Sequence, residues 1–389
     1  MDLEKIRAET SGIKNVIHLN NCGAGLMPQP VLDAVVTHLR REAEIGGYEA
    51  AREADAAIEN SYDAIATLLN CRREEIAVVE NATVAWDMAF YGLPMGQGDV
   101  VLTAVSEYAS NYIAYLQRAK RDGIDVRIIP NDKYGRTDPA ALAGMIDDKR
   151  VKLISITHLP TNGGLINPAA EIGKIARDAG IPYLLDACQS AGQLPLDVRA
   201  IGCDMLSATG RKYLRGPRGT GFLYVRNSML NKLDPPVLDL HSAKWTEPDR
   251  FEILPDARRF ENWENYIAGK IGLGVAVDYA LDIGLDAIAE RIASLADSLR
   301  QRMSKISGVT IRDIGTKKSG IISFSVRDED PNMVLSKLAV VGINISVSGA
   351  GSTLLDMQQR DIAIMNRLGV HYYNTEAELD RFLECLAAL

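Results

Sequence analysis

Cysteine and histidine are both scarce in this chain, which has five of each among its 389 residues. The cysteines, at positions 22, 71, 188, 203 and 385, lie far apart, and no two have the spacing of a zinc site. The histidines form no close pair, so no metal site is expected. Scattered cysteines of odd number also argue against a disulfide framework and favour a reduced, cytoplasmic protein.

The chain also has no excess of basic residues and no long apolar segment. A net charge of -8 and a pI near 5.3 argue against nucleic acid and anionic membranes as the main partners. No uncharged apolar run is long enough to cross a bilayer, and the start MDLEKIRAET lacks the pattern of a signal peptide. The hydrophobic content of 47% is ordinary for a globular protein, and the length allows more than one domain.

Short apolar runs alternate with amphipathic segments through the middle of the chain. The expected strands span residues 76–80, 100–104, 126–130, 152–158, 182–186, 205–208 and 221–225, and the expected helices span 83–92, 111–122, 139–147 and 169–179. This alternation predicts an α/β fold with a mostly parallel central sheet. Sites in such sheets lie at the carboxyl ends of strands, where Asp186, His158 and Thr209 are expected.

The pattern changes near residue 267. Helices are expected at 267–283, 285–306, 331–340 and 375–389, with short strands at 309–313, 320–326 and 343–347. We therefore predict a large domain of residues 15–260 and a smaller α+β domain made of residues 1–14 and 261–389. Residues 234–264, rich in proline, aspartate and aromatics, are interpreted as an irregular connector over the site.

One lysine and one aspartate stand in an informative context. Lys212 ends the segment SATGRK, which precedes the glycine-rich turn GPRGTG at residues 216–221. Asp186 lies 26 residues upstream, where it closes an apolar strand. Pyridoxal 5'-phosphate (PLP) requires a lysine amine for its Schiff base and a carboxylate that keeps its pyridine nitrogen protonated. A buried lysine has a lowered pKa and can attack an aldehyde, so PLP is the predicted cofactor.

The motifs around these two residues resemble those of the class V aminotransferase family of fold-type I PLP enzymes, which includes cysteine desulfurases, C–S lyases and isopenicillin N epimerase. The resemblance extends from HLNN at residues 18–21 to YNT at residues 373–375, with the motifs in the same order. It implies that Lys212 forms the internal aldimine and that Asp186 pairs with the pyridine nitrogen. It also implies a homodimer whose sites are built from both subunits.

The phosphate site is expected at the segment NATV, which follows a strand and opens a helix. Amides at a helix start bind phosphate, although a plain helix cap at Asn81 or Thr83 would have the same pattern. With the resemblance, the predicted cofactor-binding residues are Ala82, Thr83, Val84, Tyr108, Asn162, Asp186, Gln189, Thr209, Arg211 and Lys212. Tyr108 stands where desulfurases have a histidine, and it is expected to stack on the ring and to take part in catalysis. Which of Thr161 and Asn162 faces the cofactor stays open.

The resemblance also implies how the substrate is held. Arg367, six residues before the YNT segment, corresponds to an arginine that clamps the α-carboxylate. Asn21 belongs to a loop beside that carboxylate. Asn262 belongs to a segment that reaches the partner's cofactor, and there Glu264 replaces a threonine that is common in relatives.

The predicted reaction begins with an amino acid bound as an external aldimine, from which Lys212 removes the α-proton to give a quinonoid. No cysteine occurs between Ser346 and Arg367, which disfavours a persulfide-forming desulfurase. We therefore expect a C–S lyase acting on an S-substituted cysteine, similar to the hercynylcysteine sulfoxide lyase branch. Three alternatives remain: an aminotransferase or epimerase of the same family, a non-catalytic homologue that acts as a binding protein, and a nucleotide-binding protein, although the chain lacks nucleotide-binding motifs.

Overall fold

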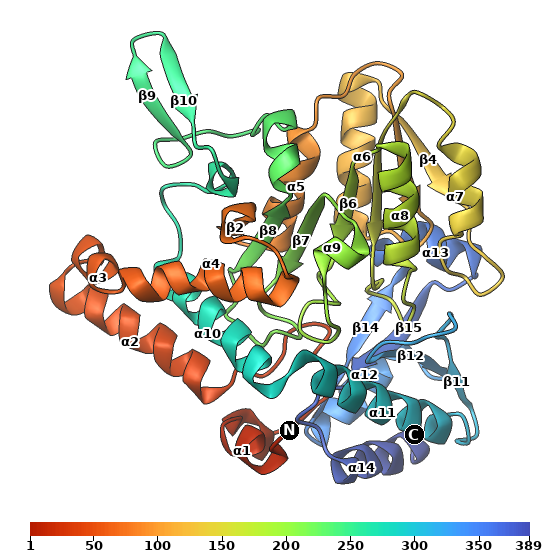
Figure 1. Cartoon of the computed structure of the whole chain (residues 1–389). Helices are drawn as coiled ribbons and strands as arrows, with labels where there is room; N and C mark the ends of the chain where they lie inside the picture. Colours follow the sequence, from red (N-terminus) through yellow and green to blue (C-terminus); the bar gives the residue numbers. More distant parts are fainter.

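The computed structural model describes all 389 residues, and a seven-stranded sheet forms its centre (Figure 1). In spatial order the strands are β2 (Ile76–Val79), β8 (Gly221–Val225), β7 (Met205–Thr209), β6 (Tyr183–Asp186), β5 (Val151–Thr157), β3 (Val100–Ala104) and β4 (Asp125–Ile129). Strand β8 is antiparallel to both neighbours, and the other pairs are parallel. The predicted α/β fold with a mostly parallel sheet is confirmed.

Helices cover both faces of this sheet. They are α5 (Ala82–Gly92), α6 (Ala109–Asp122), α7 (Pro139–Met145), α8 (Ala169–Ala179) and α9 (Val198–Ile201). Leu184 packs with Trp86 of α5 and Tyr115 of α6, whereas the next residue, Leu185, packs on the other face with Ile172 of α8. Because successive strand residues face opposite sides and both sides are covered, the strands are apolar without interruption.

A second, four-stranded antiparallel sheet follows in the C-terminal part. Its order is β11 (Val309–Ile311), β12 (Ile321–Val326), β15 (Ile364–Gly369) and β14 (Ser346–Gly349), with helices α11 (Leu285–Met303), α12 (Pro331–Val340), α13 (Leu354–Gln359) and α14 (Glu376–Ala387). Phe324 of this sheet and Phe382 of α14 belong to the same cluster of buried apolar side chains as Leu185. The core is therefore continuous between the two sheets.

The remaining helices, except the first, form a layer beside the central sheet (Figure 1). They are α1 (Leu3–Ala8), α2 (Gln29–Ile45), α3 (Gly47–Glu53), α4 (Asp55–Leu69) and α10 (Ile267–Ile283). Helix α10 packs along α2 and α4. The domain boundary expected after residue 260 stays a prediction. No helix combines the length and apolar character that crossing a bilayer requires.

Two expectations for local structure are wrong. Residues 234–264 are not wholly irregular, because β9 (Ala243–Glu247) and β10 (Arg250–Ile253) form a hairpin that projects from the body of the molecule (Figure 1). The single strand expected at 343–347 is two strands. Strand β13 (Ile343–Asn344) pairs with β1 (Ile17–His18), and β14 pairs with β15, so the chain changes sheets at Ile345.

Candidate active site

A cavity of about 470 Å³ lies at the carboxyl ends of the parallel strands. Thr157, Asp186 and Thr209 end three adjacent strands, and all three line the cavity. The other lining residues are Asn81, Ala82, Thr83, Val84, Tyr108, Leu159, Thr161, Cys188, Gln189, Arg211 and Lys212. Nine of the ten predicted cofactor-binding residues are therefore in one place, and only Asn162 is missing from the wall.

Two donors hold the Asp186 carboxylate, which is 4% exposed. The backbone N–H of Cys188 donates to Oδ1 at 2.9 Å, and the Asn111 amide donates to Oδ2 at 3.0 Å. Both oxygens of the carboxylate are therefore held in place at the cavity wall.

Lys212 lies in the same wall and is half-buried. Burial lowers its pKa, and the neighbouring Arg211 and Arg367 lower it further, although Cys188 and Asp186 oppose them. The N-terminal loop that contains Gly25 packs against the backbone of Arg211 and Lys212. Gly25 donates its N–H to the Arg211 carbonyl at 2.8 Å, and a Cβ at Gly25 would lie 2.6 Å from the Lys212 carbonyl oxygen. Only glycine allows this approach, which fixes the backbone that carries the amine.

The N-terminus of α5 opens onto the cavity. Asn81 caps the helix, since its side chain accepts a hydrogen bond from Val84 N at 3.0 Å. Asn81 and the next three residues also line the cavity. The segment is thus both a helix cap and part of the cavity wall, and a helix start of this kind favours an anion.

The loop after β5 places Thr161, and not Asn162, at the cavity wall. The Asn162 amide is buried and donates to Asp356 Oδ2 at 2.6 Å. Thr161 Oγ1 accepts hydrogen bonds from Arg367 at 2.6 Å and from Gln189 at 3.3 Å. Thr161 therefore lines the cavity and the Asn162 side chain does not, whereas which of the two contacts the cofactor stays a prediction.

Two of the three predicted substrate residues, Arg367 and Asn21, lie behind the wall. Arg367, on β15, donates to the Thr161 carbonyl at 2.7 Å and to Ser346 Oγ at 3.1 Å. The amide nitrogen of Asn21 donates to the carbonyls of His18 and Gly369, and its oxygen accepts from Tyr373 at 2.5 Å. Both amide protons of Asn21 are thus committed to the fold, so its side chain has no free donor for a substrate.

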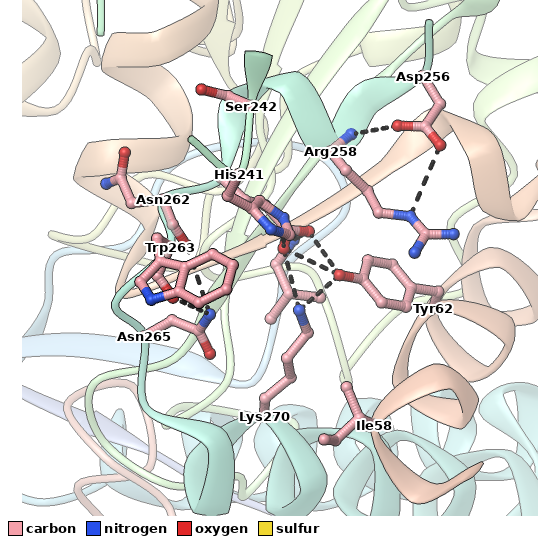
Figure 2. A network of polar contacts seen from close by, with 12 residues as sticks. Ile58, Tyr62, His241, Ser242, Asp256, Arg258, Asn262, Trp263, Asn265 and Lys270 are labelled. Atoms are coloured by element: carbon pink, nitrogen blue, oxygen red, sulfur yellow. Dashed lines mark hydrogen bonds and ion pairs between the residues drawn. The ribbon is translucent and has the colours of Figure 1, made fainter. Parts of the chain in front are cut away.

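Asn262 lies outside this cavity, beside a separate buried network (Figure 2). Lys270 Nζ lies 3.0 Å from Glu261 Oε2, and Tyr62 donates to both oxygens of that carboxylate at 2.9 Å. Val78 N donates to it at 2.8 Å, and His241 Nε2 is 3.5 Å away. Burial alone would raise the pKa of Glu261, but Lys270, His241 and Val78 N hold it below its usual value.

Replacing Lys270 by methionine should destabilise the protein by about 3 kcal/mol, because Glu261, 1% exposed, would keep a buried charge without its ammonium partner. Urea unfolding measures this free energy. The control is Arg381→Met, which removes an exposed ion pair with Glu384 and should cost less than about 1 kcal/mol. Equal losses in the two variants would contradict the importance of the buried pair.

The sequence interpretation assigned no role to Glu107 and Asn111. Glu107 directly precedes Tyr108, and Asn111 follows in the first turn of α6. The structure places both behind Asp186, where Asn111 joins the two carboxylates. Their spacing of four residues at the start of a helix is the signal that could have linked them.

The sequence of this chain is similar to those of known proteins along nearly its whole length. The family described as "Aminotransferase class-V" matches residues 17–382. A probable cysteine desulfurase of Xylella fastidiosa is 31% identical over 397 residues, covering 99% of this chain and 95% of that protein. Another, from Methanothermobacter thermautotrophicus, is 28% identical and covers 99% of this chain and 98% of its own length.

Solved structures agree with this assignment. The apo cysteine desulfurase of Thermococcus onnurineus NA1 has a TM-score of 0.92 at 26% identity and covers 99% of this chain and 97% of that one. The cystine C-S lyase C-DES, solved with its product cysteine persulfide, shares the fold with a TM-score of 0.87 at 24% identity, covering 97% and 99% of the two chains. Because the family match spans nearly the whole length and one relative exceeds 30% identity, this chain belongs to the class V aminotransferase family.

Proposed function

We propose that this protein is a PLP-dependent lyase that cleaves the carbon–sulfur bond of an S-substituted cysteine. The observation that carries the proposal is the convergence of Lys212 and Asp186, from separate segments, on one cavity at the carboxyl edge of the sheet. Relatives along the full length bear names that denote removal of sulfur from cysteine. Those names do not favour an aminotransferase or an epimerase, and the pairing of lysine and aspartate in the cavity argues against a non-catalytic homologue.

The residues present fit PLP in chemistry and size. The cavity volume is within the usual range for small-ligand sites. The Gln189 side-chain oxygen is buried at the wall without a hydrogen-bond partner, and a ring hydroxyl would supply one. Thr83, Thr209 and Arg211 stand near the N-terminus of α5, where donors for a phosphate are required. When bound, PLP supplies an aldehyde for an amine and a ring that accepts electrons.

Lys212 acts as the base in this proposal. Its lowered pKa raises the fraction of neutral amine near neutral pH, and only the neutral amine can accept a proton at Nζ. The proton comes from the substrate α-carbon. Loss of that proton, together with breakage of the Cβ–S bond, releases a thiol; water then completes the conversion of the remainder to pyruvate and ammonium, with no external oxidant or reductant.

The surrounding side chains orient the reactants. Asp186 is the residue that would hold a proton on the ring nitrogen of PLP. Tyr108, which is 37% exposed, presents a ring at the cavity mouth. Arg367 donates hydrogen bonds to Thr161 at the wall. Its guanidinium would bind the substrate carboxylate, which would replace or share these hydrogen bonds.

The cysteines of this chain do not suit a persulfide carrier. The segment Gly349–Leu354, between β14 and α13, contains no cysteine. Cys188 lines the cavity, but burial and the adjacent Asp186 raise the pKa of its thiol well above the ordinary value. A thiol that stays protonated is a weak nucleophile. We therefore propose that sulfur leaves as a small thiol and is not transferred to an enzyme cysteine.

The proposal is tested by incubating the purified protein with a panel of S-substituted cysteines. Pyruvate, keto acid and optical rotation are followed in the same samples. Pyruvate and thiol formed in equal amounts support the lyase. A keto acid that retains the substrate side chain would indicate transamination, and loss of optical rotation without pyruvate would indicate epimerisation; either result overturns the proposal.

A homodimer with shared sites is also proposed. In support, Trp263 and Tyr266 are 48% and 39% exposed, and Trp245 on the projecting hairpin is 78% exposed. Large exposed aromatics of this kind are typical of protein interfaces. In this arrangement Asn262, which is remote from the chain's own cavity, would serve the partner's site. Sedimentation of the active enzyme tests this, because a fully active monomer would contradict it.

A cytoplasmic location is proposed for the same protein. All five cysteines are free. Free thiols persist in a reducing compartment, whereas extracytoplasmic proteins usually pair them. Fractionation of cells that make the natural protein would test this location, and recovery outside the cytoplasm would contradict it.

A further inference from the structure

Glu107 is a buried carboxylate that the proposed mechanism does not use. It is 2% exposed and lies between the end of β3 and the start of α6. Its Oε1 accepts hydrogen bonds from Tyr108 N at 2.8 Å, from Thr157 Oγ1 at 2.5 Å and from Asn111 at 3.0 Å. Its Oε2 accepts from Thr103 at 2.9 Å. Four close donors hold this buried carboxylate in one orientation.

Asn111 connects this carboxylate to Asp186. Its Nδ2 donates to Glu107 Oε1 and to Asp186 Oδ2, each at 3.0 Å. An amide nitrogen has two protons, so both bonds can exist together. Only one orientation of the Asn111 amide is favourable, because the flipped amide would place its oxygen against two carboxylates and repel them. Glu107 thereby determines which way Asn111 points, and Asn111 determines how Asp186 is held.

The placement of two acids with one bridging amide also has an electrostatic effect. Burial and the nearby Asp186 raise the pKa of Glu107 to about 7, against the lowering effect of Thr157 and Asn111. The titratable groups facing the pair are Tyr115 and Tyr183 around Glu107, and Cys188 and Lys212 around Asp186. Above about pH 7, where Glu107 is ionised, its negative charge behind Asp186 favours a proton placed at the cavity side.

We propose that Glu107 and Asn111 are positioning residues that orient the Asp186 carboxylate toward the cofactor ring and add negative charge behind it. This inference rests on the proposed PLP function and deepens it. Partners of a ligand that touch neither substrate nor metal typically change affinity or activity by about tenfold to a hundredfold in metal sites, and we expect an effect of that size here.

The experiment uses the purified holoenzyme and the variants Glu107→Gln and Asn111→Leu. Glutamine keeps the shape and the Oε1 acceptor but removes the charge, whereas leucine removes both bonds of the bridge. The matched control is Glu75→Gln, which removes the charge of another buried carboxylate that accepts hydrogen bonds from the N–H groups of Arg72 and Asn227 and does not line the cavity. Three quantities are measured: the dissociation constant of PLP by equilibrium dialysis, the pH midpoint of the visible band of the bound cofactor, and the melting temperature.

We expect the PLP dissociation constant to rise about tenfold or more in both variants. The midpoint of the visible band should move to lower pH in Glu107→Gln, because a negative charge that favours the protonated chromophore has gone. Glu75→Gln should change neither quantity. If both variants only lower the melting temperature and leave affinity and midpoint as in the wild type, the inference is wrong.

The inference can be tested even if one of the two variants does not fold. If Glu107→Gln aggregates, Asn111→Leu decides alone, because it leaves Glu107 in place. Failure of the underlying function is seen separately in the wild-type protein. A wild type that binds no PLP and shows no visible band would overturn the proposed function and this inference with it, whereas a normal wild type with unaltered variants overturns only the inference.

Discussion

Lys212→Ala is expected to abolish turnover and to leave PLP only loosely held. The variant loses the amine that bonds the aldehyde and the base that takes the α-proton, so two functions disappear with one side chain. The rate should fall by at least about a thousandfold, equivalent to about 4 kcal/mol of transition-state stabilisation. Steady-state kinetics with the best substrate of the panel and a visible spectrum of the purified variant measure the two losses.

The matched control for this variant is Lys174→Ala. Lys174 is exposed on α8 and pairs only with Asp178, four residues along the helix. Removing it should leave the rate and the spectrum unchanged, which excludes a general effect of losing a lysine. A Lys212→Ala protein with the wild-type rate would remove the mechanism proposed here.

Asp186→Ala has the second largest expected effect. Alanine leaves the cavity without the carboxylate that would hold a proton on the ring nitrogen of PLP, and bound PLP would then supply less electron withdrawal for removal of the α-proton. We expect a loss of about a thousandfold or more in kcat, with a smaller change in substrate binding. The variant also leaves the Cys188 N–H without its acceptor and Asn111 with Glu107 as its only acceptor, so PLP affinity should fall as well.

Asp197→Ala is the control for this acid. Asp197 caps α9 by accepting from the N–H groups of Arg199 and Ala200, and it does not line the cavity. Its removal should cost about 1 kcal/mol of stability and leave kcat unchanged. A loss of less than about tenfold in Asp186→Ala, or about 1.4 kcal/mol, would count against the role assigned to that carboxylate.

The names of the relatives and the residues of this chain are not fully in agreement. The relatives reported above are named cysteine desulfurases, whereas this chain has no cysteine between Ser346 and Arg367. Membership of the family and chemistry at the substrate α-carbon do not depend on that cysteine. The fate of the sulfur does, which is why the substrate panel measures the thiol together with pyruvate.

Order along the chain was determined by the sequence itself. The strands that end at Asp186 and Thr209, and the helix that begins after Asn81, follow from local apolar patterns and from polar residues at their ends. Since parallel strands point the same way, their final residues had to meet at one edge, and Lys212 had to follow close behind. The α/β fold and most of the cavity wall could therefore be predicted.

Only the tertiary structure decided which side chains of those segments turn toward the cavity. Asn162 is directed to Asp356, 194 residues away, and Asn111 reaches Asp186 across 75 residues. Asn21 gives both of its amide protons to backbone carbonyls, one of them 348 residues away. Such choices depend on hydrogen-bond partners that packing brings together from distant parts of the chain, and a local pattern contains no information about them.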